Sequence, residues 1–225
     1  MTAATPGLTP VGIFGGTFNP VHFGHLRSAL ELVETLDLAG MRLMPSAVPP
    51  HREPPGCSAE HRAAMVELAV AGESRLVCDR RELGRPGPSY TIDSLAEISR
   101  DLGPAHSLCL VMGGDAVASL DTWYRWRELL DWAHIVVIAR PGWHLPADGE
   151  VADWLQRHRA DAAEVLRRRR SGAVIIEQLR PLAISATEIR DLLRQGRSAR
   201  YLLPAAVLDY IDEHGLYGER RGKNG

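Results

Sequence analysis

The stretch GGTFNPVHFGHL, residues 15–26, combines residue types that suit the binding of phosphate groups. Gly15 and Gly16 follow an apolar run, and glycine lets the main chain turn sharply and approach a ligand closely. The helical pattern that follows presents free N–H groups and the positive end of its dipole to an anion. His22 and His25 lie three residues apart on one face of this helix, where imidazoles can donate hydrogen bonds to a polyphosphate. The stretch therefore predicts a phosphate-binding loop.

Two simpler interpretations of His22 and His25 stay open on these residues alone. A histidine pair at this spacing is often an ordinary part of a helix surface. Zinc binding is a second option, although no third His, Cys or acidic residue lies nearby at ligand spacing. The stretch contains neither GxxxxGK[ST] nor GxGxxG, so it matches neither the P-loop nor the dinucleotide fingerprint. The combination of glycines, proline and histidines is more specific than any of its parts.

Strand-like and helical patterns alternate along the chain. We expect strands at 11–14, 41–46, 75–83 (strand, then loop), 107–115, 134–142 and 173–179, and helices at 22–38, 58–72, 89–103, 149–170, 185–195 and 204–214. This alternation predicts an α/β protein with an open, doubly wound, mostly parallel sheet and helices on both faces. We expect a single domain over 1–217, in which 144–170 is the candidate for a helical insertion, and a disordered tail over 218–225.

Ligands of such sheets bind outside the carboxyl ends of the strands. Several unusual groups of residues follow the predicted strands: Gly15, 49–52, 113–115, Arg140 and, after a short loop, Ser185. We therefore expect loops that are distant in the sequence to converge on one edge of the sheet and to form one site there.

Composition and charge exclude several classes of function. The 225 residues include 26 basic and 28 acidic ones and carry a formal net charge of −2, so we expect no general attraction to nucleic acid or membrane. The run RRRR, residues 167–170, is expected to end a helix in solvent, since no interleaved aromatic residues favour base stacking. Apolar runs fall short of the roughly 20 residues that span a bilayer, and the first residues do not resemble a signal peptide. Three cysteines without CxxC spacing are expected to be reduced thiols in a cytoplasmic protein. The sequence is also compatible with a homo-oligomer.

Two motifs resemble those of a known superfamily. GGTFNPVHFGH, residues 15–25, resembles the signature of the HxGH nucleotidyltransferases, and ISATEIR, residues 184–190, resembles their ISxTxxR motif. The resemblance implies a Rossmann-like α/β fold. Ser185 also fits a helix N-cap, with Glu188 completing a capping box, and Arg190 lies further into that helix within reach of a phosphate.

Further stretches resemble the bacterial nicotinate-nucleotide adenylyltransferase family. They are VPPHR (48–52), PSYT (88–91), MGGDA (112–116), DTWYRW (121–126), ARPG (139–142) and LLPAAVLDYIDEHGLY (202–217), so that the resemblance extends over residues 11–217. It implies that ATP and nicotinate mononucleotide react to give deamido-NAD and pyrophosphate in NAD biosynthesis. The implied mechanism is direct in-line attack of the mononucleotide phosphate on ATP, without a covalent intermediate. Mg²⁺ is expected with ATP, held by phosphates and water rather than by metal ligands of the protein.

The resemblance also implies roles for individual residues. The catalytic residues would be His22, His25 and Arg190. Residues expected to bind ATP and its phosphates are Gly15, Gly16, Thr17, Phe18, Gly113, Asp115, Arg140, Ser185 and Thr187. Residues expected to bind nicotinate mononucleotide are His51, Arg52, Thr91, Trp123 and Tyr124. Because nicotinate is a flat ring with a carboxylate, Trp123 would supply an aromatic face, and Thr91 and the Tyr124 backbone would supply donors.

Plain structural roles compete with some of these assignments. Trp123 could belong to an amphipathic surface helix, with Trp126 in the core. Asp115 could act as a helix N-cap as well as a partner for ribose hydroxyls, and Arg140 could form a surface ion pair.

Four other functions stay open. The chain could act on phosphopantetheine or prefer the nicotinamide nucleotide, since acid and amide differ by one atom. It could also be a nucleotide sensor without catalysis, or a metal-binding protein that uses His22 and His25.

Overall fold

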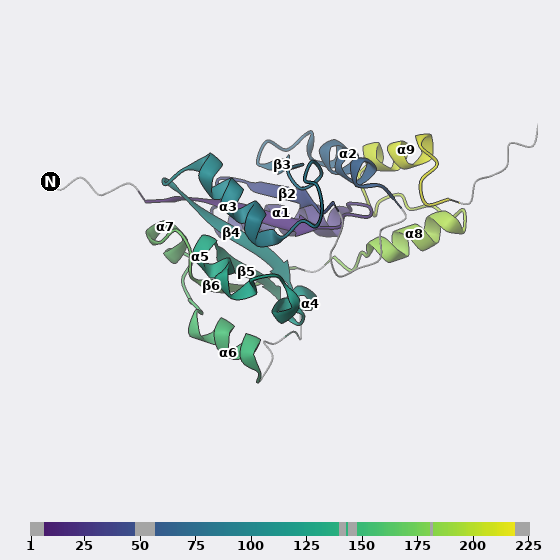
Figure 1. Ribbon diagram of the computed structural model, residues 1–225. Coiled ribbons are helices and arrows are strands. Elements are labelled where there is room, and N and C mark those ends of the chain that lie inside the picture. Colours follow the sequence, from purple (N-terminus) through teal and green to yellow (C-terminus); the bar gives the residue numbers. More distant parts are fainter. Residues whose placement is uncertain (1–6, 48–56, 140–142, 144–147, 181, 219–225) are drawn as a thin grey trace, which may run out of the picture.

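One parallel sheet organises the fold in this computed structural model, which describes residues 7–47, 57–139, 143, 148–180 and 182–218. In these residues six strands pair in the order β3–β2–β1–β4–β5–β6, and every pairing is parallel (Figure 1). The strands are β1 (Thr9–Gly16), β2 (Met41–Pro45), β3 (Leu76–Cys78), β4 (His106–Gly113), β5 (His134–Ala139) and β6 (Val174–Gln178). The strand order reverses between β1 and β4, and ligands of open α/β sheets bind at such a switch point.

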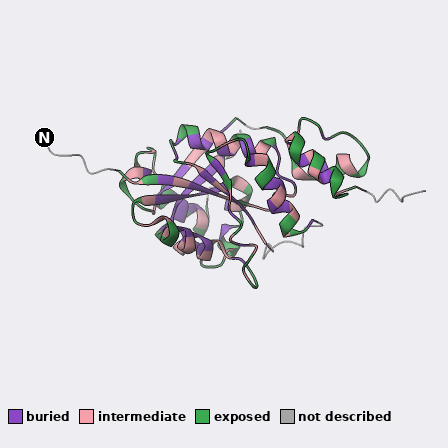
Figure 2. Ribbon diagram, turned by 90° about the horizontal axis from the view of Figure 1, so that it is seen from above, coloured by how far each residue is buried: buried purple, intermediate pink, exposed green. Residues whose placement is uncertain are grey.

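Helices cover both faces of the sheet. They are α1 (Phe23–Thr35), α2 (Ala59–Val70), α3 (Thr91–Leu102), α4 (Gly114–Val117), α5 (Leu129–Trp132), α6 (Glu150–Arg157), α7 (Val165–Arg168), α8 (Ala186–Arg194) and α9 (Ala205–Glu213), with 3-10 turns η1 (Leu120–Thr122) and η2 (Trp126–Glu128). Successive side chains of a strand point to opposite faces. Cys109 and Val111 of β4 therefore join the core under α1, α2 and α9, whereas Leu110 and Met112 join the core under α3, α5 and α6. Figure 2 shows the strands as the buried centre between these two layers. The predicted fold class is confirmed.

Short polar side chains begin two of the predicted helices. Ser58 Oγ accepts a hydrogen bond from the His61 N–H (3.2 Å) at the start of α2. Ser185 Oγ accepts one from the Glu188 N–H (3.1 Å) at the start of α8, which confirms the N-cap expected there. Such a cap satisfies an N–H group that has no partner inside the helix.

The segment 149–170 differs from the single polar helix that we expected. It forms two short helices, α6 and α7, because the chain returns to the sheet between them, where Arg159 forms an isolated parallel bridge with Val174. Trp154 of α6 and Leu166 of α7 are buried in the two cores. The segment is thus part of the crossover that carries the chain from β5 to β6.

The arginine run at 167–170 makes specific contacts within the protein. Arg167 donates to the Leu36 carbonyl (3.3 Å) at the end of α1 and pairs with the Asp37 carboxylate. Arg170 donates to Ser99 Oγ of α3 (3.2 Å). The run therefore connects α7 to helices on both faces of the sheet.

The two C-terminal helices return to the switch point. Figure 1 shows α8 and α9 beyond the right-hand ends of the strands, on the side opposite α7. Helix α9 packs against α2, where His61 Nδ1 and the Tyr210 hydroxyl are 2.9 Å apart. No helix in the described ranges has the length and apolar character needed to cross a membrane.

Candidate functional site

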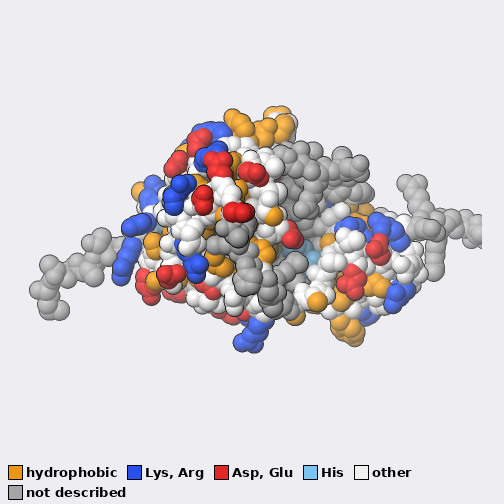
Figure 3. All heavy atoms as spheres, turned by 90° about the horizontal axis from the view of Figure 1, so that it is seen from below, with side chains coloured by type: hydrophobic (Ala, Val, Ile, Leu, Met, Phe, Trp, Pro, Cys, Tyr) orange, Lys and Arg blue, Asp and Glu red, His pale blue; other side chains and the backbone are white. Residues whose placement is uncertain are grey.

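A cavity of about 410 Å³ lies at the carboxyl ends of β1 and β4. Its walls come from the ends of β1, β2 and β4, from the start of α3 and from the η1 region. Lining residues that the sequence analysis expected are Gly15, Gly16, Thr17, Thr91, Gly113, Trp123 and Tyr124. In Figure 3, histidine side chains (pale blue) are visible in the hollow between the main body and the lobe at the right. The end of β1 and Gly113 therefore meet at one edge of the sheet, as predicted, whereas Ser185 does not line the cavity and 49–52 and Arg140 lie outside the described residues.

The two histidines of the opening motif stack at the start of α1. Their ring centroids are 3.8 Å apart, and the His22 N–H donates to His25 Nδ1 at 3.3 Å. The His25 ring also lies 6.3 Å from the ring of Phe14, which lines the cavity. His22 is 5% exposed, and its Nδ1 has no hydrogen-bond partner in the described chain. Neither histidine is among the residues that line the cavity, and this nitrogen is a buried polar atom that the described residues leave unpaired.

Burial keeps both imidazoles neutral at pH 7. It lowers the pKa of His22 to about 4. It also lowers the pKa of His25 to about 3, and a charge on neighbouring His22 lowers it further. In this neutral state each ring carries one N–H donor rather than a fixed positive charge.

The two sequence motifs meet in space. A Cβ atom at Gly24 would lie 2.9 Å from His22 Nδ1 and 3.5 Å from the carbonyl oxygen of Ile184, so a side chain there would collide with the His22 ring. Arg190 of α8 donates from Nη1 to the carbonyl oxygen of Asn19 at 2.7 Å. The start of α8 thus lies against the start of α1.

The first turn of α3 faces the cavity without a side-chain cap. Ser89, Tyr90 and Thr91 line the cavity, and the N-cap residue Tyr90 makes no capping hydrogen bond with its side chain. The start of a 12-residue helix therefore offers N–H groups and a positive dipole end to the cavity. Trp123 and Tyr124 line the same region, and the Tyr124 ring lies 4.4 Å from the Tyr90 ring. This region suits a small, flat anion.

The structure corrects one alternative for the WYRW stretch. Trp123 directly follows the 3-10 turn η1 and is not part of an amphipathic surface helix. Trp126 begins η2 and is buried in the core, as expected.

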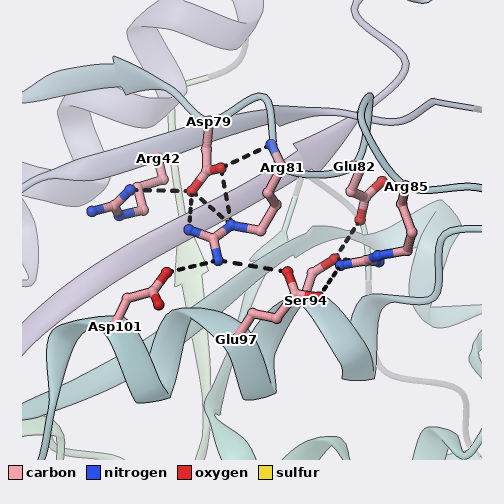
Figure 4. Close-up of polar contacts among 8 residues, drawn as sticks. All are labelled: Arg42, Asp79, Arg81, Glu82, Arg85, Ser94, Glu97 and Asp101. Carbon is pink, nitrogen blue, oxygen red and sulfur yellow. Dashed lines mark hydrogen bonds and ion pairs between the residues drawn. The ribbon is translucent and has the colours of Figure 1, made fainter.

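Glu82 is a cavity residue that the sequence analysis missed. Its side chain is buried, it lines the cavity, and its Oε1 accepts a hydrogen bond from Ser94 Oγ of α3 at 2.9 Å. Behind it, Arg85 pairs with Glu97 at 2.8 Å in the polar network of Figure 4. Burial raises the pKa of Glu82, and the negative charges of Asp79 and Glu97 add to this effect. A single glutamate in a segment interpreted as strand and loop gave no sequence signal for this position.

A fully buried arginine connects two loops of the site. Arg62 of α2 donates from Nη1 to the carbonyl oxygen of Thr17 (2.7 Å). From Nη2 it donates to the carbonyl oxygens of Ser46 (2.6 Å) and Ala47 (3.0 Å). Since Thr17 and Ser46 both line the cavity, Arg62 sets the distance between the loops that follow β1 and β2. A charged residue on the buried face of a helix is not predictable from the helical pattern.

Other expected residues either do not line the cavity or lie outside the described chain. Phe18 is buried, and its ring packs against those of Phe14 (5.9 Å) and His25 (5.0 Å). Asp115 is exposed in the first turn of α4, and Ser185 and Thr187 are exposed at the start of α8. Thr187 Oγ1 accepts a hydrogen bond from Arg190 at 3.1 Å. His51, Arg52 and Arg140 lie outside the described residues.

The described residues offer no cage for a metal ion. Within them, His, Cys, Asp and Glu side chains form no group of three or more that could hold one. The described residues therefore supply no third ligand for a zinc ion at His22 and His25. Cys57, Cys78 and Cys109 are free thiols.

Comparisons with known proteins agree with this geometry. Residues 13–192 match the family model described as "Cytidylyltransferase-like". A protein of Aeromonas salmonicida is 48% identical over 208 residues, which cover 92% of this chain and 97% of the relative. A protein of Pseudomonas fluorescens is 50% identical over 210 residues, with 92% and 96% covered. Both bear the name "Probable nicotinate-nucleotide adenylyltransferase".

Solved structures share the fold at low sequence identity. The nicotinic acid mononucleotide adenylyltransferase of Plasmodium falciparum complexed with NaAD superposes with a TM-score of 0.69 at 15% identity, covering 93% of this chain and 97% of the other. The same protein complexed with APC gives a TM-score of 0.66 at 16% identity, with the same coverage.

Proposed function

Because the chain belongs to the nicotinate-nucleotide adenylyltransferases, within the cytidylyltransferase-like family, we propose a division of labour among its residues for that reaction. The chain transfers the adenylyl group of ATP to nicotinate mononucleotide and releases deamido-NAD and pyrophosphate, a step of NAD biosynthesis. The observation that carries our assignment is one cavity whose lining combines two different kinds of group. The glycine pair at the end of β1 lines it, and so do the uncapped start of α3 and Trp123.

The shared cavity favours direct transfer between the two nucleotides. ATP would lie with its phosphates against Gly15, Gly16 and Thr17, and its ribose near Asp115 beyond Gly113. The phosphate oxygen of the mononucleotide then attacks the α-phosphorus in line with the departing pyrophosphate, without a covalent intermediate. Such a reaction depends on positioning and on stabilising charge more than on a general base.

The two motifs would stabilise the charge that develops on the phosphates. His25 accepts a hydrogen bond at Nδ1, so its neutral ring carries the proton on Nε2 as a donor. Arg190 uses two N–H groups within the protein, and the guanidinium has others for the leaving pyrophosphate. Ser185 and Thr187, at the start of α8, would also bind these phosphates. Donors aimed at developing charge are each worth about 10²–10³ in turnover in other enzymes.

The start of α3 would recognise the nicotinate carboxylate. Thr91 and the Tyr124 backbone offer donors, and Trp123 offers an aromatic face for the ring. Donors placed for a carboxylate disfavour the amide, because the amide NH₂ would face another donor. His51, Arg52 and Arg140 are assigned to the substrates from the sequence resemblance alone.

Mg²⁺ would accompany ATP and help to neutralise its phosphates. Since the described residues contain no cluster of carboxylates for it, phosphate oxygens and water would be its main ligands. We further propose that the chain acts in the cytoplasm on these small molecules, independently of nucleic acid.

Pyrophosphate release tests the proposed function. The full chain is incubated with ATP and Mg²⁺, with nicotinate or nicotinamide mononucleotide in parallel, and with excess EDTA in a third arm. We expect strong preference for the acid and no release with EDTA. Equal use of acid and amide would contradict the assignment of the α3 start. No release with either nucleotide would contradict the function itself, and would favour phosphopantetheine as acceptor or a sensor without catalysis.

A further inference from the structure

The last described turn of the chain reaches the phosphate-binding loop. Tyr217 follows α9, and its hydroxyl donates to Asn19 Oδ1 at 2.6 Å, across 198 positions of sequence. Its backbone has a φ of +63°, which is uncommon for a residue with a side chain. Its side chain is partly buried against the core that α1, α2 and α9 share. The C-terminal segment is therefore part of the same structural unit as the β1–α1 loop.

Asn19 receives two hydrogen bonds from different parts of the chain. Its side-chain oxygen accepts from Tyr217, and its carbonyl oxygen accepts from Arg190 Nη1 at 2.7 Å. One residue thus joins the C-terminal tyrosine to an arginine that we assign to the leaving pyrophosphate. Asn19 also lies in the loop between Thr17, which lines the cavity, and His22.

The hydrogen bond from the Tyr217 hydroxyl to Asn19 can affect the position of the Arg190 guanidinium. An arginine side chain has several rotatable bonds, and its position depends on the acceptors that hold the guanidinium. If the Asn19 carbonyl shifts, the direction of the remaining N–H groups shifts with it. Misplacement by about 1 Å can cost about 10²-fold in rate.

We propose that Tyr217 is a positioning residue for the adenylyl transfer, acting through Asn19 to fix the direction of Arg190. The inference rests on the proposed function, because it assigns Arg190 to the leaving group. It adds Tyr217, which follows α9, to the residues that serve the active site. The competing explanation is that Tyr217 only attaches the C-terminus to the protein.

A double-mutant cycle distinguishes positioning from simple attachment. Tyr217→Phe removes one oxygen and keeps the ring. We expect it to lower kcat about tenfold, the effect of one lost hydrogen bond in a positioned network. In the Arg190→Ala background the same change is expected to alter kcat by about twofold at most, because no guanidinium is left to position. The KM for nicotinate mononucleotide is expected to stay unchanged, because that substrate is assigned to the start of α3.

Tyr210→Phe is the matched control. Tyr210 lies on α9 itself and also loses a hydroxyl hydrogen bond, to His61, but it forms no hydrogen bond with Asn19 or Arg190 in the described residues. We expect wild-type kcat from it. Thermal unfolding of each variant checks folding, and Asn19→Ala removes the same bond from its other end if Tyr217→Phe fails to fold.

Three outcomes would overturn the inference. They are an unchanged kcat in Tyr217→Phe, an equal fold-loss in the presence and absence of Arg190, and a loss of kcat in Tyr210→Phe as large as in Tyr217→Phe. Failure of the proposed function is a different result, since the wild-type chain would then release no pyrophosphate with nicotinate mononucleotide.

Discussion

His22 and His25 are joined by both ring stacking and a backbone hydrogen bond. The centroids are 3.8 Å apart at an interplanar angle of 30°, and His25 Nδ1 accepts the His22 N–H at 3.3 Å. A ring nitrogen that accepts is unprotonated, so the proton of neutral His25 is on Nε2. The capping contact at the start of α1 thus selects the tautomer that can donate to a phosphate.

We predict that His25→Ala lowers kcat by about 10²–10³-fold while changing the KM for ATP much less. The donor is expected to act mainly when charge increases on the phosphates in the transition state. Steady-state pyrophosphate release measures both constants. His106→Ala is the control, because His106 lies at the opposite end of β4 and its side chain bonds only the Leu102 carbonyl among the described residues. Wild-type turnover in His25→Ala would disprove the catalytic role.

The same pair predicts how stability depends on pH. The pKa values of His22 and His25 are lowered to about 4 and about 3, whereas both lie near 6.5 in the unfolded chain. At pH values between the folded and the unfolded pKa, the unfolded chain binds more protons than the folded chain. The free energy of unfolding therefore falls as the pH drops below 6.5, by up to about 1.4 kcal/mol per pH unit for each histidine.

Urea denaturation between pH 7 and pH 4.5 measures this dependence. The double variant His22→Asn, His25→Asn is expected to show a shallower loss of unfolding free energy over that range. Above pH 6.5 both histidines are neutral in the folded and the unfolded state. There the unfolding free energies of the two proteins should change equally with pH. Equal slopes below pH 6.5 would show that the pair titrates normally.

Local sequence patterns predicted the scaffold well, because the physics that shapes each element is local. The apolar run at 11–14 lies in β1 as predicted, and the Ser185 hydroxyl caps α8. Gly15 and Gly16 were expected to form a turn, but they continue β1 and pair with Met44 and Pro45 of β2. The segment 149–170 was predicted wrongly as one helix, since its division depends on the distant bridge between Arg159 and Val174. A polar helical pattern contains no information about such a tertiary contact.

Residues of the candidate site were predictable from the sequence only where they belong to a motif. His22, Arg190 and Trp123 belong to recognisable stretches. Arg62 and Tyr217 act through partners 45 and 198 positions away, and no local pattern indicates either contact. Buried polar groups of this kind depend on which carbonyls the fold leaves unpaired, and the fold must be known first.

Glu82 leads to a prediction about substrate binding. Its carboxyl lines the region assigned to nicotinate mononucleotide, an anion, so an ionised Glu82 opposes binding. Burial raises the pKa of Glu82 above its usual range, and the negative charge therefore develops at higher pH than for an ordinary glutamate. In the wild-type chain the KM for nicotinate mononucleotide is expected to rise with pH as this charge develops.

Glu82→Gln removes the charge and keeps an oxygen to accept the hydrogen bond from Ser94. At pH values where Glu82 of the wild type is ionised, we expect this variant to lower the KM for nicotinate mononucleotide about fivefold. The lower KM reflects the relief of about 1 kcal/mol of like-charge repulsion. Its KM should vary less with pH than that of the wild type. Glu97→Gln is the matched control, because Glu97 belongs to the same network but is not among the residues that line the cavity. Removing the Glu97 charge makes Glu82 easier to ionise and is not expected to lower the KM. If Glu97→Gln lowers the KM as much as Glu82→Gln does, the effect comes from disturbing α3 rather than from a charge in the cavity.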